Sequence, residues 1–381
     1  MQPEPVLILT GSVKDTAIYR MPTRETYGEG EFRFRDDYSV FDWVHGEGGR
    51  PMPDEIPGKG VAQCLIGAYF FEQAGKSGII RTTYKGLVDP ASHSILPAGQ
   101  PVSTNRMGIK VVQVVNPEHM EDPATGVPSY REYRQEPQLG CAVVPIEFIF
   151  RFGLPKGSSA FRRMKEGKAK PEFFGLAAVP KGDQPIWFGE PRMDYSTKFD
   201  PRGDLYDLGR EWYMQSAGMD GLELYQIEAV TANVARMMGR EYERIGMKLW
   251  DGKLEFVFDP FVSGAERTIS LGDVPGALDE VRVLVGGQQR SKQFVRDVYE
   301  TSQPEWVAAC RKEEDAGGDW QNRVVSQGLV PRRLSSAELD LASGLYTSVA
   351  NALWGREVIP GAPSMEQIDR DFKKFQEMAG K

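Results

Sequence analysis

The sequence predicts an α+β protein with two lobes, in which a β-rich N-terminal lobe precedes a mixed α/β lobe. Short stretches with period-two alternation of apolar and polar residues dominate the first 150 residues, where one segment alone has helical spacing. Two longer segments with apolar residues at helical spacing follow, and a predicted strand pair lies between them. A cleft between two lobes of this kind is a common place for a nucleotide.

The N-terminal lobe is expected to span residues 1–115. Residues 5–20 have the pattern of strand, glycine-containing turn and strand, and residues 58–76 have helical spacing. Further short strands are predicted at about 78–84 and 107–115. The lobe is therefore a small sheet with one helix.

The next segment, residues 116–140, is polar and rich in Pro and Glu, which predicts an inserted surface loop. The second lobe is expected to span residues 141–355 and to begin with a buried strand at 142–151. Residues 155–205 are rich in Pro, Gly and charge, and we expect them to be irregular.

Two long helices are predicted in the second lobe, at about 219–245 and 335–355. Ser335 and Glu338 have the spacing of a capping box at the start of the later helix. The tail, residues 356–381, is expected to hold one short charged helix.

The composition limits the partners of the chain. Its 381 residues carry a formal net charge of −8, so a broad basic surface for nucleic acid or membranes is not expected. The three cysteines are far apart, which argues against zinc and disulfides and favours a reducing cytoplasm. We expect small-molecule substrates, and assembly into a homo-oligomer stays open.

The strand "WDGKLEFVFD", residues 250–259, raises the main functional question. Asp251, Lys253 and Glu255 follow one another on one side of this strand, about 7 Å apart. One interpretation is a solvated sheet face with cross-strand charge pairs. The other is a phosphate and metal site, because that chemistry needs oxygen ligands and a cation on a rigid element.

Eight short motifs occur along the chain in an order that resembles one family, the phosphoribosylaminoimidazole-succinocarboxamide (SAICAR) synthetases of purine biosynthesis. They are "GSVKD" (11–15), "DYSVFD" (37–42), "PDEIPGKG" (53–60), "VPIEFIFRFGLPKGS" (144–158), "STK" (196–198), "DGKLEF" (251–256), "LGDVPGALDEVR" (271–282) and "SKQFVRD" (291–297). The resemblance implies a SAICAR-synthetase-like two-lobed fold with ATP in the cleft, covered by the N-terminal lobe.

The resemblance also implies a reaction. ATP would activate the carboxylate of a phosphoribosyl-aminoimidazole carboxylate (CAIR) as an acyl phosphate. The amine of L-aspartate would then attack, giving SAICAR, ADP and phosphate. The cofactors implied are ATP and Mg²⁺, and the enzyme would be an ATP-dependent carboxylate–amine ligase.

The same resemblance gives roles to the charged strand. Glu255 and Asp273 would be the metal ligands, with Asp279 as a competing choice for the second ligand. Lys253 would neutralise the transferred phosphoryl group, and Asp251 would orient Lys253 or the attacking amine.

The remaining residues implied by the resemblance would bind nucleotide or substrates. Those near ATP are Lys14, Ser12, Lys110 and Glu147. Ser12 stands where the family has a lysine, and an internal ion pair is the alternative for Glu147. Those near the substrates are Arg151, Ser158 and Arg282 for the ribose 5′-phosphate, Ser39 and Asp42 for the imidazole, and Lys198 and Asp204 for the amino acid.

Two alternatives stay open. The stretch "RGDL", residues 202–205, lacks a histidine that is frequent in the family. The first alternative is therefore a paralogous ligase that uses a different amine or a different carboxylate as substrate. A small-molecule kinase of related fold is the second alternative, since it would use a similar lobed cleft and metal-binding strand pair.

Overall fold

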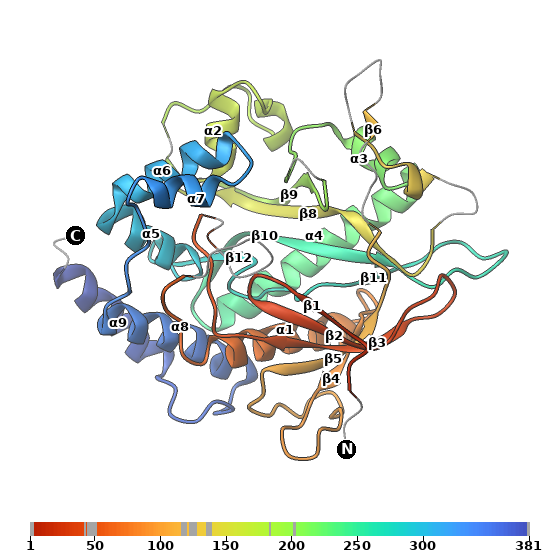
Figure 1. The fold of residues 1–381 in the computed structure, drawn as a ribbon, viewed down its shortest axis with the longest axis horizontal. Helices are drawn as coiled ribbons and strands as arrows, with labels where there is room; N and C mark the ends of the chain where they lie inside the picture. The colour runs from red at the N-terminus through yellow and green to blue at the C-terminus, as the bar shows by residue number, and fades with distance from the viewer. Residues whose placement is uncertain are drawn as a thin grey trace.

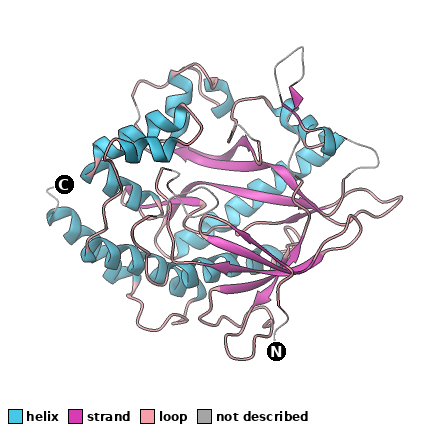
Figure 2. Ribbon diagram, viewed as in Figure 1, coloured by secondary structure: helices cyan, strands magenta, loops and turns pink. Residues whose placement is uncertain are grey.

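The protein folds into two antiparallel sheets surrounded by helices (Figures 1 and 2). The computed structural model describes residues 4–41, 43, 52–115, 120–121, 128–134, 139–182, 184–200 and 203–378. The predicted α+β class with two lobes is confirmed by this arrangement. Within these ranges, no helix is long and apolar enough to cross a membrane.

The first sheet belongs to the N-terminal lobe and has five strands in the order β1-β2-β3-β5-β4. Its strands are β1 (Leu7–Thr10), β2 (Lys14–Arg20), β3 (Gly28–Phe34), β4 (Tyr84–Leu87) and β5 (Arg106–Val111). Helix α1 (Lys59–Lys76) packs against β3, β4 and β5. Most of its residues are buried, because α8 and α4 of the second lobe cover the helix as well.

The second sheet carries the charged strand at its centre. It has the order β13-β12-β10-β8-β9, and β11 pairs with β10. Its strands are β8 (Ala142–Leu154), β9 (Ile186–Thr197), β10 (Lys248–Phe258), β11 (Ile269–Leu271), β12 (Val281–Val285) and β13 (Gln288–Gln289). Helix α4 (Gly221–Arg244) packs against β8, β9 and β10.

The other described elements are shorter or lie toward the C-terminus, where α5 to α9 gather on the left in Figure 1. The helices are α2 (Ser159–Lys165), α3 (Arg210–Ser216), α5 (Gln293–Ser302), α6 (Pro304–Asp315), α7 (Trp320–Ser326), α8 (Ser336–Trp354) and α9 (Met365–Met378). Two 3₁₀ turns, Arg131–Arg134 and Pro171–Phe174, and a strand pair, β6 (Met120–Glu121) with β7 (Pro128–Ser129), complete the set.

The two long helices of the second lobe form as predicted, because their ends carry capping residues. Ser335 accepts a hydrogen bond from the backbone N–H of Glu338, and the Glu338 side chain accepts one from Ser335 N–H. Gly355 ends α8 at φ 65°, a backbone conformation that glycine adopts without strain. Asp220 and Glu223 form the same kind of box at the start of α4.

The prediction that residues 155–205 are irregular is wrong. This stretch contains α2 and the strand β9, which pairs with β8 from Ile146↔Thr197 to Leu154↔Ile186. Strand β9 includes Gly189 and Pro191, two residue types that are uncommon inside strands, so the sequence predicts irregular structure here. Because β9 lies at the edge of the sheet, it tolerates a proline there.

The segment 116–140 does not lie wholly on the surface. Tyr130 and Tyr133 are 0% and 1% exposed, and the Tyr133 hydroxyl donates to the carbonyl oxygens of Val115 and Val143 at 2.9 and 3.1 Å. Most residues of the segment are polar, so its composition predicts a surface loop although it contains these two buried rings. Each aromatic ring buries more apolar surface than most side chains do. The lobe boundaries themselves stay a prediction.

A buried ion pair connects α1 to the loop before β12. Lys59 Nζ lies 2.6 Å from Asp279 Oδ2, and the two side chains are 1% and 4% exposed. The Tyr346 hydroxyl of α8 donates to the other Asp279 oxygen at 2.7 Å. Burial alone would raise the pKa of Asp279, but the Lys59 ammonium lowers it to about 2. The two lobes and α8 are therefore joined at one carboxylate.

We expect Asp279→Ala to lower the free energy of unfolding by about 3–5 kcal/mol, because it leaves the Lys59 ammonium buried without its partner. The folded pKa lies below the ordinary value of 3.8, so the stabilisation is present above that pH and is lost as the pH falls toward 2. Urea unfolding of wild type and variant at several pH values measures this.

The matched control is Asp340→Ala on the exposed face of α8, which should change stability by less than about 0.5 kcal/mol. A loss for Asp279→Ala no larger than that of the control would contradict the structural role of the ion pair.

Candidate active site

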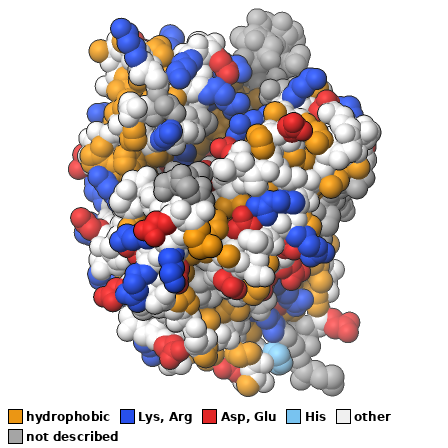
Figure 3. Space-filling model, turned by 90° about the vertical axis from the view of Figure 1, so that its left-hand side faces the viewer, with side chains coloured by type: hydrophobic (Ala, Val, Ile, Leu, Met, Phe, Trp, Pro, Cys, Tyr) orange, Lys and Arg blue, Asp and Glu red, His pale blue; other side chains and the backbone are white. Residues whose placement is uncertain are grey.

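A cavity of about 2280 Å³ opens beside the charged side of β10. It is lined from the N-terminal lobe by Ser12 and Ser39, and from the second lobe by β8, β10, β12, α2, α5 and α9. The volume exceeds the roughly 300–1,000 Å³ of a site for one small molecule, so it has room for more than one substrate. In Figure 3, which looks onto the side of α5 and α9, several Lys and Arg side chains surround the hollowed upper part of the face.

The polar side of β10 faces the interior. Asp251 and Glu255 are 4% and 6% exposed, so the solvated-face interpretation of this strand is wrong. A buried charge is costly unless it is paired. Each of the three charged side chains on this face accordingly has partners of the opposite sign from neighbouring strands or loops.

Asp251 lies between two arginines because of the strand register, which pairs it with Arg151 on β8 and Arg282 on β12. Arg282 Nε donates to Asp251 at 2.7 Å, and Arg151 Nη1 donates to it at 3.1 Å. The expected contact of Asp251 with Lys253 is absent from the ion pairs of the described residues. Asp251 therefore pairs with the two arginines and not with Lys253, and its expected role toward the attacking amine stays a prediction.

Arg151 is less available to a phosphate than the sequence implies. It is 3% exposed, and its Nε and Nη2 donate to Asp194 at 3.1 and 2.9 Å in addition to the contact with Asp251. Burial lowers the pKa of Arg151, but Asp194 and Asp251 outweigh burial and raise it. Arg282, whose side chain is 21% exposed, keeps a free edge toward the cavity.

Lys253 is surrounded by carboxylates. Its Nζ lies 2.6 Å from Glu147, 3.4 Å from Glu280 and 3.6 Å from Glu255. Burial lowers the pKa of Lys253, but Glu280, Glu255 and Glu147 together raise it well above 10.5. Lys253 is therefore a fixed positive charge at the cavity wall. Glu147 forms an ion pair with Lys253, which is the alternative role that the sequence left open for Glu147.

Glu255 and Asp273 are brought together by the β10–β11 hairpin, where Gly272 N–H donates to Glu255 O at 2.9 Å. Lys198 lies 2.7 Å from Glu255, and Lys14 lies 2.8 Å from Asp273. Burial raises the pKa of Asp273, but Lys14 and Lys198 lower it below its ordinary value. Neither carboxylate lines the cavity directly, whereas Lys253, which contacts Glu255, does.

These two carboxylates fit a magnesium ion. Glu255 Oε1 is buried and accepts no hydrogen bond among the described residues, and Lys253 Nζ lies 3.6 Å from it, so this oxygen keeps lone pairs for a metal ligand bond. The described part of the chain has no group of three or more His, Cys, Asp or Glu side chains suited to a metal. Mg²⁺ usually takes one or two carboxylates and completes its shell with phosphate oxygens and water, which agrees with this donor set.

Asp279 is a weaker choice for the second metal ligand than Asp273. Both of its oxygens are already bound, one to Lys59 and one to Tyr346. The assignment of Asp273 stays a prediction.

The structure places most of the other expected residues at the cavity, but Lys14, Lys110 and Lys198 do not line it. Nζ of Lys110 lies 5.2 Å from the ring centre of Tyr27, just before β3. Asp42 lies outside the described residues. The expected residues that do line the cavity are Ser12, Ser39, Glu147, Arg151, Ser158, Asp204, Asp251, Lys253 and Arg282.

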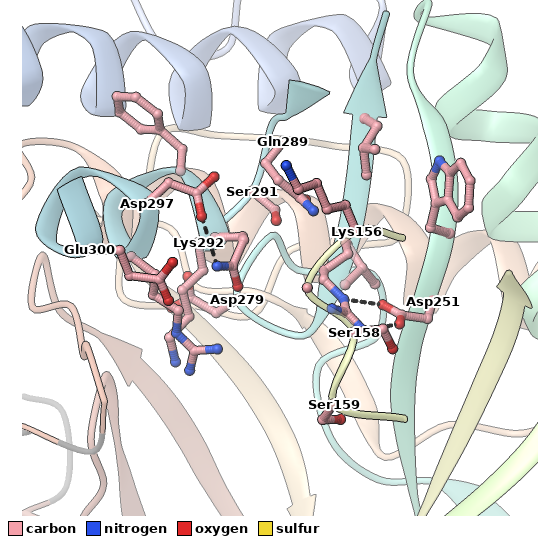
Figure 4. Close-up of a pocket in the computed structure, with 18 of the residues that line it drawn as sticks. Lys156, Ser158, Ser159, Asp251, Asp279, Gln289, Ser291, Lys292, Asp297 and Glu300 are labelled. Atoms are coloured by element: carbon pink, nitrogen blue, oxygen red, sulfur yellow. Dashed lines mark hydrogen bonds and ion pairs between the residues drawn. The ribbon is translucent and has the colours of Figure 1, made fainter. Parts of the chain in front are cut away.

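Sequence reasoning missed several cavity residues. Glu280, Lys292 and Arg296 all line the cavity, and each lies in a quoted motif but received no role of its own. Burial lowers the pKa of Lys292 to about 8, while Asp279 opposes the effect. Figure 4 shows Lys292 beside Asp279, on the side of the cavity formed by α5. The "SKQFVRD" motif was the signal that could have found the two cations.

Comparison with known proteins identifies the family of the chain. The sequence model of the SAICAR synthetase family matches residues 7–313. An Archaeoglobus fulgidus protein provisionally named phosphoribosylaminoimidazole-succinocarboxamide synthase is 32% identical over 367 residues, covering 96% of this chain and 100% of that protein. A Thermoplasma volcanium phosphoribosylaminoimidazole-succinocarboxamide synthase is 26% identical over 304 residues, covering 77% of this chain and 83% of that protein.

A solved structure has the same fold. The SAICAR synthase of Saccharomyces cerevisiae, determined with SAICAR, superposes with a TM-score of 0.56 at 18% identity, over 92% of this chain and 95% of that one. At this identity the likeness concerns the fold alone. The family match and the full-length archaeal relative show that this chain belongs to the SAICAR synthetase family.

Proposed function

We propose that this protein is an ATP-dependent ligase that joins the carboxylate of CAIR to the amine of L-aspartate, giving SAICAR, ADP and phosphate. The observation that carries the proposal is the charged cluster of Lys253, Glu255 and Asp273 beside a large cavity, in a member of this family. The three free cysteines are buried, which suits a reducing cytoplasm.

The chemistry has two steps. A carboxylate oxygen of CAIR attacks the γ-phosphorus of ATP, and the bond from that phosphorus to ADP breaks. The aspartate nitrogen then attacks the acyl carbon, loses a proton, and expels phosphate. Both steps place negative charge on transferring oxygens, which a fixed cation stabilises where it forms. Lys253 is suited to this role, because its neighbours keep it charged.

Glu255 and Asp273 would hold Mg²⁺, which would neutralise part of the triphosphate charge. Lys14 and Lys198, which pair with these carboxylates, would exchange them for phosphate oxygens. Ser12 lines the cavity beside the β1–β2 turn and would contribute a hydroxyl contact.

The ribotide would lie with its 5′-phosphate between Arg282 and Ser158, and Arg151 would act indirectly by holding Asp251. Ser39 and Asp42 are proposed for the imidazole side. Lys198 and Asp204 are proposed for the amino acid.

A second candidate keeps the chemistry and changes the amine. Gly203 and Asp204 stand in the stretch that lacks the frequent family histidine, and Asp204 lines the cavity. The cations Lys292 and Arg296 favour a donor with carboxylates, so aspartate is the first choice.

The test of the function is ADP release with CAIR, ATP and Mg²⁺ in the presence and absence of each amino acid. We expect sustained turnover to require L-aspartate and to yield SAICAR by mass spectrometry. Turnover that is equally fast with no amine would indicate a kinase, and turnover with another amine alone would favour the paralogue.

Lys253→Met should lower kcat by about 10²- to 10³-fold with little change in the KM for ATP, because the charge matters most as the phosphoryl group moves. Steady-state kinetics measures this. Lys248→Met, which removes a cation from an exposed position of the same strand outside the cavity, is the matched control and should keep full activity. An unchanged kcat in the Lys253 variant would defeat the proposed role.

Glu255→Gln and Asp273→Asn should each raise the Mg²⁺ concentration needed for half-maximal activity, because each replaces a charged oxygen ligand by a neutral one. Titration of activity with Mg²⁺ at saturating ATP measures the shift. Asp279→Asn should lower the melting temperature without changing the Mg²⁺ requirement. If Asp279→Asn shifts the requirement and Asp273→Asn does not, the second ligand is Asp279.

A further inference from the structure

Two loops border the same end of the cavity, and each carries a buried hydroxyl. Ser158 follows the turn at Lys156, and Ser291 follows β13 (Figure 4). The two serines are 3% and 1% exposed, both line the cavity, and the Oγ of each has no hydrogen-bond partner in the described part of the chain. Buried hydroxyls are nearly always partnered, so a pair of unpartnered ones beside a cavity points to a ligand.

The backbone brings Ser291 back beside Arg282. Strand β13 turns onto β12, where Gln289 pairs with Leu284, and Arg290 N–H donates to Val283 O at 2.8 Å. Arg290, the residue before Ser291, is therefore hydrogen-bonded to Val283, the residue after Arg282. An arginine fork and two hydroxyls at one end of the cavity can all donate hydrogen bonds, which suits a ligand group rich in acceptor oxygens.

The C-terminal helix α9 holds this loop through Arg290. The Arg290 guanidinium is buried, lies 3.7 Å from the ring centre of Phe372, and lies 3.6 Å from Asp369 Oδ1. The rings of Phe294 and Phe372 pack at 4.9 Å. Helix α9 is thus fixed to the start of α5, and its own residues Phe375 and Gln376 line the cavity.

Helix α9 is also seated on α8. At Gly344 an added Cβ would lie 2.7 Å from Ile368 Cδ1, so the glycine makes room for the buried Ile368 of α9. The helix therefore has a defined position and forms a wall of the cavity. It lies beyond residue 313, where the match to the family sequence model ends.

We propose that Ser291 is a second hydroxyl ligand of the ribotide 5′-phosphate, opposite Ser158, and that Arg290, held by α9, positions it. This proposal rests on the proposed function for the identity of the ribotide. The phosphate monoester presents three oxygens, which accept from Arg282, Ser158 and Ser291. Helix α9 thereby sets the affinity for the ribotide, although none of its residues takes part in the reaction steps.

The direct test is calorimetric titration of the full-length protein with ribose 5-phosphate, which needs no turnover. Ser291→Ala should weaken binding by about 10- to 100-fold, the scale of one lost hydrogen bond to a charged group, and Ser158→Ala should do the same. Ser291→Thr keeps a hydroxyl and should restore most of the affinity. Binding by Ser291→Ala as tight as wild type would overturn the role of Ser291.

The positioning role of Arg290 is tested with Arg290→Met, which keeps an apolar stem against Phe372 and removes the charge. We expect weaker ribose 5-phosphate binding and a higher KM for CAIR, with the KM for ATP and kcat unchanged. Asp369→Asn, which leaves Arg290 in place, should shift the same quantities by a smaller factor. Lys374→Met removes an exposed cation from the same helix and is the control.

The outcomes separate this proposal from the proposed function. If ribose 5-phosphate binds wild type and Ser291→Ala weakens it, the phosphate subsite holds even where no amine-dependent turnover is found. If turnover is normal but Arg290→Met and Asp369→Asn lower only the melting temperature, Arg290 is structural and its positioning role is overturned.

Discussion

The charged side of β10 is buried, and this constraint sets the pairing of most ionisable groups around the cavity. Asp251, Lys253 and Glu255 alternate in sign along the strand, and a buried charge without a partner would cost several kcal/mol. The neighbouring strands and loops therefore present groups of the opposite sign at each level, arginines beside Asp251, carboxylates beside Lys253 and a lysine beside Glu255. The resulting lattice of charges fixes side chains that would otherwise be mobile, which is what a site for phosphate transfer needs.

Periodicity and capping residues predict much of the fold, because those signals are local. The helix at Ser336–Trp354 has a capping box at one end and a glycine at the other, and the strand at 250–259 alternates from Trp250 to Phe256. Strand β9 could not be predicted in the same way, since Gly189 and Pro191 disfavour it locally and only its pairing with β8 holds it. The buried Tyr130 and Tyr133 were missed for a related reason, because their partners are distant in sequence.

The candidate site also has a part that the sequence predicts and a part that only the folded structure shows. Motif order identifies the charged strand, Arg282 and the two carboxylates, but it does not say which group faces which. The contact of Asp251 with Arg151 and Arg282 follows from the register of three strands, which no single motif contains. Glu280 and Ser291 were within quoted motifs, yet their importance lies in a 3.4 Å contact and in an unpartnered hydroxyl that only the folded chain reveals.

The lysines that cover Glu255 and Asp273 have a consequence for how the protein tolerates chelators. Many metal sites leave their carboxylates mutually repelling when empty, so that folding depends on the ion. Here Lys198 and Lys14 neutralise the two carboxylates from within the chain. If these carboxylates bind Mg²⁺ as proposed, we expect the folded state to keep its integrity without the ion, so that metal availability would govern turnover and leave protein abundance and lifetime untouched.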